Sequence, residues 1–264
     1  MITVLGASGF IGSNIVKKLQ RENVAFYAPK RNENLFDRAL GDIIYCIGLT
    51  ADFRTKPFDT VAAHICKLNE ILSKGNFSSL TYLSSTRVYI NSNNAFAEET
   101  DKVLVDPLDA DDLYTLTKLT GERLCLSSGK NCKIVRLSNV IGKQDEQTTF
   151  LSSIINEIKN SATLELHQTL TSSKDYIFID DIVELIIKIV KGGNQKIYNL
   201  ASGDNISNQE IILELKKYFT FSHTINENAK EIIFPKISNN KICAEFEFEP
   251  KNISEQLSLI LKNK

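Results

Sequence analysis

Gly6-Ala-Ser-Gly9-Phe-Ile-Gly12 stands between two segments of different periodicity, and this placement decides the fold. The run before it, residues 2–5, is short and apolar like a buried strand, and the segment from Asn14 continues at helical spacing. A strand that turns tightly into a helix leaves the first N–H groups of the helix unpaired, and these donors favour a phosphate. The spacing departs from the common G-x-G-x-x-G pattern. The strand before it and the helix after it nevertheless indicate a dinucleotide site.

Two further segments carry the chemistry. Ser84 and Ser85 follow the apolar run 79–83, at the carboxyl edge of the sheet where ligands bind in open α/β folds. Tyr114 and Lys118 are four residues apart and share one face of a helix. An ammonium beside a phenol lowers the phenol pKa from about 10, which suits acid–base work. An ordinary helix turn gives the same Tyr-x-x-x-Lys pattern, but the combination predicts a nicotinamide-dependent enzyme that transfers a hydride.

These segments resemble those of the extended short-chain dehydrogenase/reductases, the NAD-dependent epimerase/dehydratase family that acts on nucleotide sugars. The likeness extends over nearly the whole chain, through Arg136-Leu-Ser-Asn139-Val-Ile-Gly142, Lys174-Asp-Tyr-Ile-Phe-Ile-Asp180-Asp181, Ile197-Tyr-Asn-Leu-Ala-Ser-Gly203 and Phe248-Glu-Pro250. The resemblance implies that Ser85, Tyr114 and Lys118 are the catalytic residues and that Lys118 also contacts the nicotinamide ribose. The expected cofactor-binding residues are Gly6, Ser8, Gly9, Phe10, Ile11, Gly12, Lys30, Arg31, Cys46, Ile47, Gly48, Tyr114, Lys118 and Leu137. The expected substrate-binding residues are Thr86, Arg87, Asn139 and Lys174.

Two of these substrate-binding residues are placed by the resemblance alone. Asn139 would face the sugar. Lys174 stands where relatives commonly place an arginine for the substrate diphosphate, and a lysine keeps the charge but loses the bidentate fork. His64 stands where relatives often have an asparagine, and we expect a packed helix residue there rather than an acid or base.

Short apolar runs alternate with helical spacing along the chain, which predicts an α/β fold with a doubly wound, Rossmann-like parallel sheet. The expected strands lie near residues 2–6, 24–28, 42–47, 79–84, 133–138, 164–167 and 197–201. The expected helices lie near 11–20, 58–74, 112–127, 149–160, 180–191, 207–218 and 252–262. Relatives usually have another strand and helix after the second strand. Only Pro29 to Asp42 are available here, so we expect that βα unit to be shortened or absent.

The same alternation suggests how the chain divides. Residues 1–141 with 175–201 are expected to form the NAD(P)-binding domain, and residues 142–174 with 202–264 a small substrate-binding lobe.

The cofactor depends on the end of the second strand, where NAD enzymes place an acid and an arginine accommodates the 2′-phosphate of NADP. Lys30 and Arg31 lie there without an acid, which favours NADP and leaves NAD possible. The two residues could instead be a solvated turn, and Glu33 is close enough to weaken the inference.

The residues after Ser85 narrow the reaction. Sugar-nucleotide 4,6-dehydratases have Asp-Glu there, and the epimerase-reductases that make GDP-fucose have a cysteine at the position of Arg87 and a histidine after the Asn-Val-x-Gly segment. This chain has Thr86-Arg87 and no such histidine. What remains is hydride chemistry at one carbon. The first expectation is reduction of the C4 ketone of a nucleoside-diphosphate 4-keto-6-deoxyhexose for surface polysaccharide. A 4-epimerase and a non-catalytic NADP sensor are the alternatives. Arg87 could contact substrate or solvent.

Composition excludes several other classes of protein. The chain has 264 residues, 42% of them hydrophobic and 24% charged, and a net charge of −1 without a basic stripe for nucleic acid. No apolar run approaches membrane-spanning length, and the early strand argues against a signal peptide. The five cysteines show no paired spacing, so we expect reduced thiols, no metal site and a cytoplasmic protein. We expect a homodimer through the helices near 58–74 and 112–127.

Overall fold

The computed structural model describes residues 1–50, 52–142 and 150–261, and its centre is a six-stranded parallel sheet. The strand order is β2-β1-β3-β4-β6-β10. These strands are β1 (Ile2–Leu5), β2 (Phe26–Tyr27), β3 (Asp42–Tyr45), β4 (Ser79–Ser85), β6 (Cys132–Leu137) and β10 (Ile197–Leu200). Every neighbouring pair in this sheet is parallel. The predicted α/β fold with a Rossmann-like sheet is therefore confirmed.

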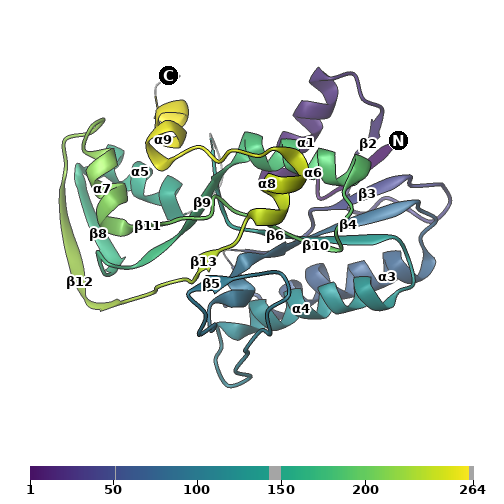
Figure 1. Ribbon diagram of the computed structural model, residues 1–264, viewed down its shortest axis with the longest axis horizontal. Coiled ribbons are helices and arrows are strands. Elements are labelled where there is room, and N and C mark those ends of the chain that lie inside the picture. The colour runs from purple at the N-terminus through teal and green to yellow at the C-terminus, as the bar shows by residue number, and fades with distance from the viewer. Residues whose placement is uncertain (51, 143–149, 262–264) are drawn as a thin grey trace.

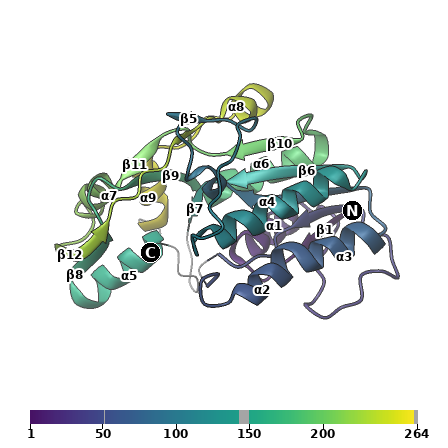
Figure 2. The ribbon, with the colours of Figure 1, turned by 90° about the horizontal axis from the view of Figure 1, so that it is seen from below.

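Helices cover both faces of this sheet (Figures 1 and 2). One face carries α1 (Phe10–Arg21) and α6 (Ile179–Gly192), which pack on apolar side chains of the sheet. The other face carries α2 (Pro57–Val61), a π-helical turn η1 (Ala62–Cys66), α3 (Lys67–Lys74) and α4 (Asp112–Ser127). Because both faces are covered, the strands are nearly continuous apolar runs rather than alternating ones.

The expectation that one βα unit is shortened or absent is also confirmed. Residues 28–41, all of which the structure describes, form no helix and no strand, and their only sheet-like contact is an isolated bridge between Ala39 and Asn76. β2 therefore lies at the edge of the sheet, with β1 as its one neighbour there.

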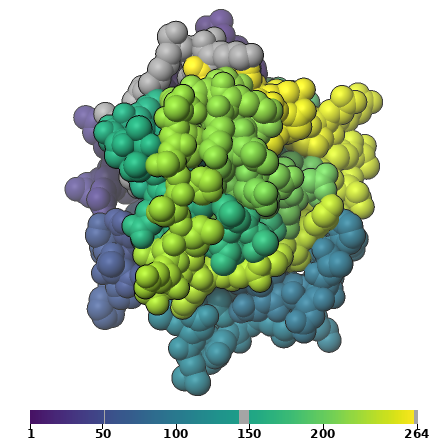
Figure 3. Space-filling view, turned by 90° about the vertical axis from the view of Figure 1, so that its left-hand side faces the viewer, coloured from purple at the N-terminus to yellow at the C-terminus, as the bar shows by residue number. Residues whose placement is uncertain are grey.

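A second group of elements lies beside the carboxyl end of the sheet and surrounds a core of its own (Figure 1). It contains β7 (Asn139–Ile141), α5 (Phe150–Ser161), β8 (Thr163–Gln168), β9 (Ser173–Phe178), β11 (Asn205–Ser207), α7 (Asn208–Leu215), β12 (Ser222–Lys230) and α9 (Ile253–Leu261). Seen from this end, the green and yellow-green segments after residue 200 fill the middle of the surface (Figure 3).

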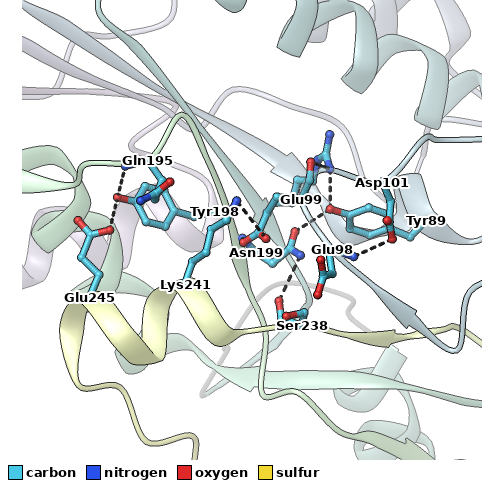
Figure 4. A network of polar contacts seen from close by, with 11 residues as sticks. Tyr89, Glu98, Glu99, Asp101, Gln195, Tyr198, Asn199, Ser238, Lys241 and Glu245 are labelled. Atoms are coloured by element: carbon cyan, nitrogen blue, oxygen red, sulfur yellow. Dashed lines mark hydrogen bonds and ion pairs between the residues drawn. The ribbon is translucent and has the colours of Figure 1, made fainter.

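Buried polar contacts tie the last part of the chain to the sheet (Figure 4). Tyr89 donates its hydroxyl hydrogen to Asn199 over 2.9 Å, and the Asn199 amide donates to the Ser238 carbonyl over 3.2 Å. Nearby, Lys241 Nζ lies 3.3 Å from Glu99 Oε2 and forms an ion pair with it. The segment includes β13 (Lys236–Ile237), which pairs with β5 (Phe96–Ala97), and α8 (Asn240–Phe246). No helix in the described residues is long and apolar enough to cross a membrane.

Candidate functional site

The glycine turn between β1 and α1 has the geometry that its sequence predicts. Gly6 has φ of +81°, and a Cβ there would lie 2.9 Å from the carbonyl carbon of Cys46. A Cβ at Gly12 would lie 2.3 Å from the Gly6 oxygen, so α1 can approach the turn only with glycine at this position. α1 begins after Gly9, and among the described residues no side chain caps it. The free N–H groups at this end suit a phosphate group.

The predicted cofactor-binding residues next to these glycines differ in their exposure to solvent. Ser8 is exposed beside the turn, whereas Phe10 and Ile11 are half-buried against the apolar core under α1. The turn is therefore exposed to solvent at Ser8, and Phe10 and Ile11 attach its other side to the core. The residues present therefore fit a dinucleotide whose pyrophosphate lies at the start of α1.

The loop after β3 lies against the candidate catalytic residues. Cys46 donates its backbone N–H to the Leu5 carbonyl over 2.9 Å, which holds the start of the loop to β1. Ile47 packs on the apolar core beneath the sheet. Gly48 is exposed, and a Cβ there would lie 3.1 Å from His64 Nε2 and 3.4 Å from Lys118 Nζ. A side chain at this position would fill the space beside Lys118, where the resemblance places the nicotinamide ribose.

Ser85 and Tyr114 meet at the carboxyl edge of the sheet. Successive strand residues point to opposite faces, and the Ser84 hydroxyl donates to Glu122 over 2.6 Å in the interior. Ser85 instead accepts the Arg87 backbone N–H over 3.1 Å, and hydrogen bonding to Ser85 acts to lower the pKa of Tyr114, so the two side chains are neighbours. The structure therefore brings together the serine and tyrosine that the sequence predicts.

Lys118 is buried one turn after Tyr114. Its Nζ donates to the Leu83 carbonyl over 2.9 Å and lies 5.7 Å from the centre of the Tyr114 ring. Burial lowers the pKa of Lys118 to about 8, and Glu122 opposes this shift. The expectation that Lys118 lowers the Tyr114 pKa is wrong for this structure. Burial raises the pKa of Tyr114, while hydrogen bonds to Ser85 and Thr50 act against it.

Arg87 retains unused hydrogen-bond donors. It lies in the 3₁₀ turn η2 (Thr86–Tyr89), and its Nη2 is 3.5 Å from Asp111 Oδ2. Arg54 holds the same carboxylate more closely, with Nη2 donating to Oδ2 over 2.7 Å. Among the described residues the buried Nε of Arg87 has no hydrogen-bond partner. Burial lowers the pKa of Arg87, with Asp111 opposing the shift. An anionic ligand would satisfy this guanidinium better than Asp111 alone.

Arg87 shares a cavity of about 80 Å³ with Lys174 and Asn139. Among the described residues, no aspartate or glutamate lines this cavity. Burial and the neighbouring Arg87 together lower the pKa of Lys174 to about 8. The Asn139 amide donates to the Asp175 carbonyl over 2.9 Å, which fixes its orientation. Two cations without a facing carboxylate make this cavity suited to an anion.

The remaining predicted residues lie apart from this group. The Thr86 hydroxyl is buried and donates to the Leu137 carbonyl over 3.3 Å. This hydroxyl and this carbonyl are therefore hydrogen-bonded to each other rather than to a ligand. Lys30 and Arg31 are exposed after β2, and no ion pair in the described ranges uses them. Glu33 accepts hydrogen bonds from the Tyr27 hydroxyl and the Lys30 N–H, so its carboxylate is engaged beside the strand end.

Two neighbours of the site were missed by the sequence reasoning. Thr50 hydrogen-bonds to Tyr114, and Asp111 joins Arg54 and Arg87. Thr50 follows the carboxyl end of β3 just as Ser85 ends β4, so the rule that ligands bind at this edge could have identified it. Asp111 carried no comparable signal, because its partners lie far from it in the sequence.

Among curated proteins, the chain is similar to dTDP-4-dehydro-6-deoxyglucose reductase of Escherichia coli, with 25% identity over 190 residues. The alignment covers 66% of this chain and 58% of that enzyme, so the chain spans less than two thirds of its length.

Two solved structures show the same fold. MoeE5 in complex with UDP-glucuronic acid and NAD has a TM-score of 0.84 at 18% identity, covering 99% of this chain and 97% of that one. RMD from Pseudomonas aeruginosa complexed with NADPH has a TM-score of 0.78 at 19% identity, covering 99% of each chain. The model of the family described as "NAD dependent epimerase/dehydratase family" matches residues 50–201, more than half of the chain. The chain therefore belongs to the NAD dependent epimerase/dehydratase family.

Proposed function

We propose that this protein is an NADP-dependent reductase of the C4 ketone of a nucleoside-diphosphate 4-keto-6-deoxyhexose. The observation that carries the proposal is the meeting of Ser85, Tyr114 and Lys118 beside Gly48 in the loop after β3. When a hydride adds to a ketone, negative charge develops on the ketone oxygen. Ser85 and Tyr114 would donate hydrogen bonds to that oxygen and stabilise the charge.

The protonation of Tyr114 supports reduction. When bound, the nicotinamide would supply a hydride to the carbonyl carbon, and the oxygen then needs a proton. Because burial raises the pKa of Tyr114, the phenol is protonated at neutral pH and can donate that proton. Ser85 would orient the oxygen, and Lys118 would hold the ribose near Gly48. An epimerase must first oxidise its substrate, which calls for a phenolate rather than a phenol at this position.

The side chains beyond Ser85 argue against dehydration. A 4,6-dehydratase needs an acid and a base beside the sugar. Here the Thr86 hydroxyl is engaged with Leu137, and Arg87 is a cation at every physiological pH. Another enzyme would therefore have to supply the keto sugar.

The cation-lined cavity supports a nucleoside diphosphate as the carrier of the sugar. Arg87 and Lys174 would face a diphosphate, which would pair with Lys174, for which the described residues show no ion pair, and with the unpartnered Nε of Arg87. The exposed Lys30 and Arg31 favour the 2′-phosphate of NADP at the end of β2. The similarity to dTDP-4-dehydro-6-deoxyglucose reductase of Escherichia coli agrees with this choice of substrate.

The test is to mix the protein with NADPH and thymidine-, cytidine-, uridine- or guanosine-linked 4-keto-6-deoxy sugars, and to follow the absorbance of the reduced nicotinamide. A reductase consumes one NADPH for each sugar reduced, and we expect this stoichiometry with at least one substrate. No loss of NADPH, together with interconversion of two non-keto sugars, would instead identify a 4-epimerase.

A further inference from the structure

His64 lies in an unusual part of the helix that precedes the site. The π-helical turn Ala62–Cys66 interrupts the helix between α2 and α3, and His64 within it is 0% exposed. Such turns are rare and occur frequently at functional sites. The turn directs this buried imidazole between the loop after β3 and helix α4.

The first contact of His64 defines its protonation. The Leu49 backbone N–H donates to His64 Nε2 over 3.2 Å. A backbone N–H can only donate, so Nε2 must be the unprotonated nitrogen, and the neutral ring carries its proton on Nδ1. Burial and the nearby Lys118 lower the pKa of His64 to about 2, in agreement with a neutral ring.

The second contact leads to Tyr114. His64 Nδ1 lies 2.8 Å from Thr117 Oγ1, and the Thr117 hydroxyl donates to the Tyr114 carbonyl over 2.9 Å. With the proton on Nδ1, every hydrogen bond from Leu49 to Tyr114 has one donor and one acceptor. The His64 ring also meets the Tyr114 ring edge-on, with centroids 5.4 Å apart and planes at 83°.

We propose that His64 is a positioning residue that fixes the distance between the Gly48–Leu49 loop and the Tyr114 turn of α4. The loop and the tyrosine belong to different elements, and the imidazole hydrogen-bonds to the loop and, through Thr117, to that turn, in addition to the contact of Thr50 with Tyr114. The inference rests on the proposed function, since it assumes that the loop lies beside the nicotinamide and that Tyr114 moves a proton.

The test compares a variant of His64 that keeps its hydrogen-bonding groups with one that keeps only its ring. His64→Gln keeps one donor and one acceptor, whereas His64→Phe keeps the ring and loses both. We expect His64→Phe to lower kcat by about 10–100-fold and to weaken NADPH binding, because small misplacements of reacting groups have effects of this order. His64→Gln should stay within about fivefold of the unmodified protein, since it keeps both hydrogen-bonding functions. His167→Phe, at an exposed residue of β8, is the matched control and should change neither quantity.

A second measurement does not depend on turnover. Nitrogen chemical shifts of the His64 ring should show Nδ1 protonated and Nε2 unprotonated in the unmodified protein at pH 7. A protonated Nε2, or a His64→Phe variant that equals or exceeds His64→Gln in kcat and NADPH affinity, would overturn the proposal. If no sugar is reduced, the tautomer and the NADPH titration of the variants still decide the role of His64. If the variants do not fold, the tautomer of the unmodified protein decides it.

Discussion

Replacing Lys118 with methionine should abolish turnover and yet make the protein more stable at pH 7. The pKa of Lys118 falls from an ordinary 10.5 to about 8 because the ammonium is buried. Since one pKa unit corresponds to about 1.4 kcal/mol, burying this charge costs about 3 kcal/mol at pH 7. Methionine removes that cost but leaves the Leu83 carbonyl without its 2.9 Å donor. Allowing about 1 kcal/mol for the lost hydrogen bond, we expect a net gain of about 2 kcal/mol in the free energy of unfolding.

The sign of the pH dependence follows from the same numbers. Below pH 8 Lys118 is charged in both the folded and the unfolded chain, so the unmodified protein bears the full cost. Between about 8 and 10.5 the folded lysine is neutral while the unfolded lysine still binds a proton, so stability from this group rises with pH. The advantage of Lys118→Met should therefore be largest below pH 8 and disappear as the pH approaches 10.5.

Urea unfolding of both proteins without cofactor, at pH 7 and pH 10, measures this difference. Lys17→Met, at an exposed lysine of α1, is the control, and we expect a change within about 0.5 kcal/mol at either pH. The reasoning fails if Lys118→Met is less stable than the unmodified protein at pH 7, or if its advantage is the same at both pH values.

Three further outcomes are expected. Tyr114→Phe should lower kcat by about 10²–10⁴-fold, the usual contribution of acid–base catalysis, and near-normal rates with a true substrate would exclude this role. Replacing Lys30 and Arg31 with alanine should weaken NADPH binding and spare NADH, and a titration in which the unmodified protein prefers NADH would contradict the assignment. Glu122→Gln should lower the free energy of unfolding by about 3–5 kcal/mol, because it leaves Arg136 buried without its 2.6 Å carboxylate partner. A loss below about 1 kcal/mol in urea unfolding would show that the pair is not needed.

The sequence predicted those elements whose structure is determined by residues close to one another in the chain. The glycine spacing requires a tight turn, and the helix expected over 112–127 is α4 (Asp112–Ser127). The interval between Tyr114 and Lys118 placed both side chains on one helix. The strand-edge rule placed Ser85 at the carboxyl end of β4, and the resemblance joined it with Tyr114 in one site.

Elements that depend on distant partners could not be predicted in this way. β12 (Ser222–Lys230) is mostly polar and has no clear alternation, and it forms because it pairs in parallel with β8. The short strand β7 and helix α8 likewise follow from contacts across the chain. In the site, the position of Arg87 depends on Asp111, and the effect of Lys118 on Tyr114 was misjudged because burial cannot be estimated from sequence spacing.

The shortened connection after β2 has a consequence for how the protein resists self-association. An edge strand exposes backbone groups that can pair with a strand of another molecule. Here that strand has only two residues, Phe26 and Tyr27, and Pro29 follows without an N–H to donate. Lys30 and Arg31 then add positive charge, which repels a second copy of the same edge. Removing this pair to change cofactor preference would thus also remove a barrier to aggregation, and such variants should be checked by light scattering before their affinities are compared.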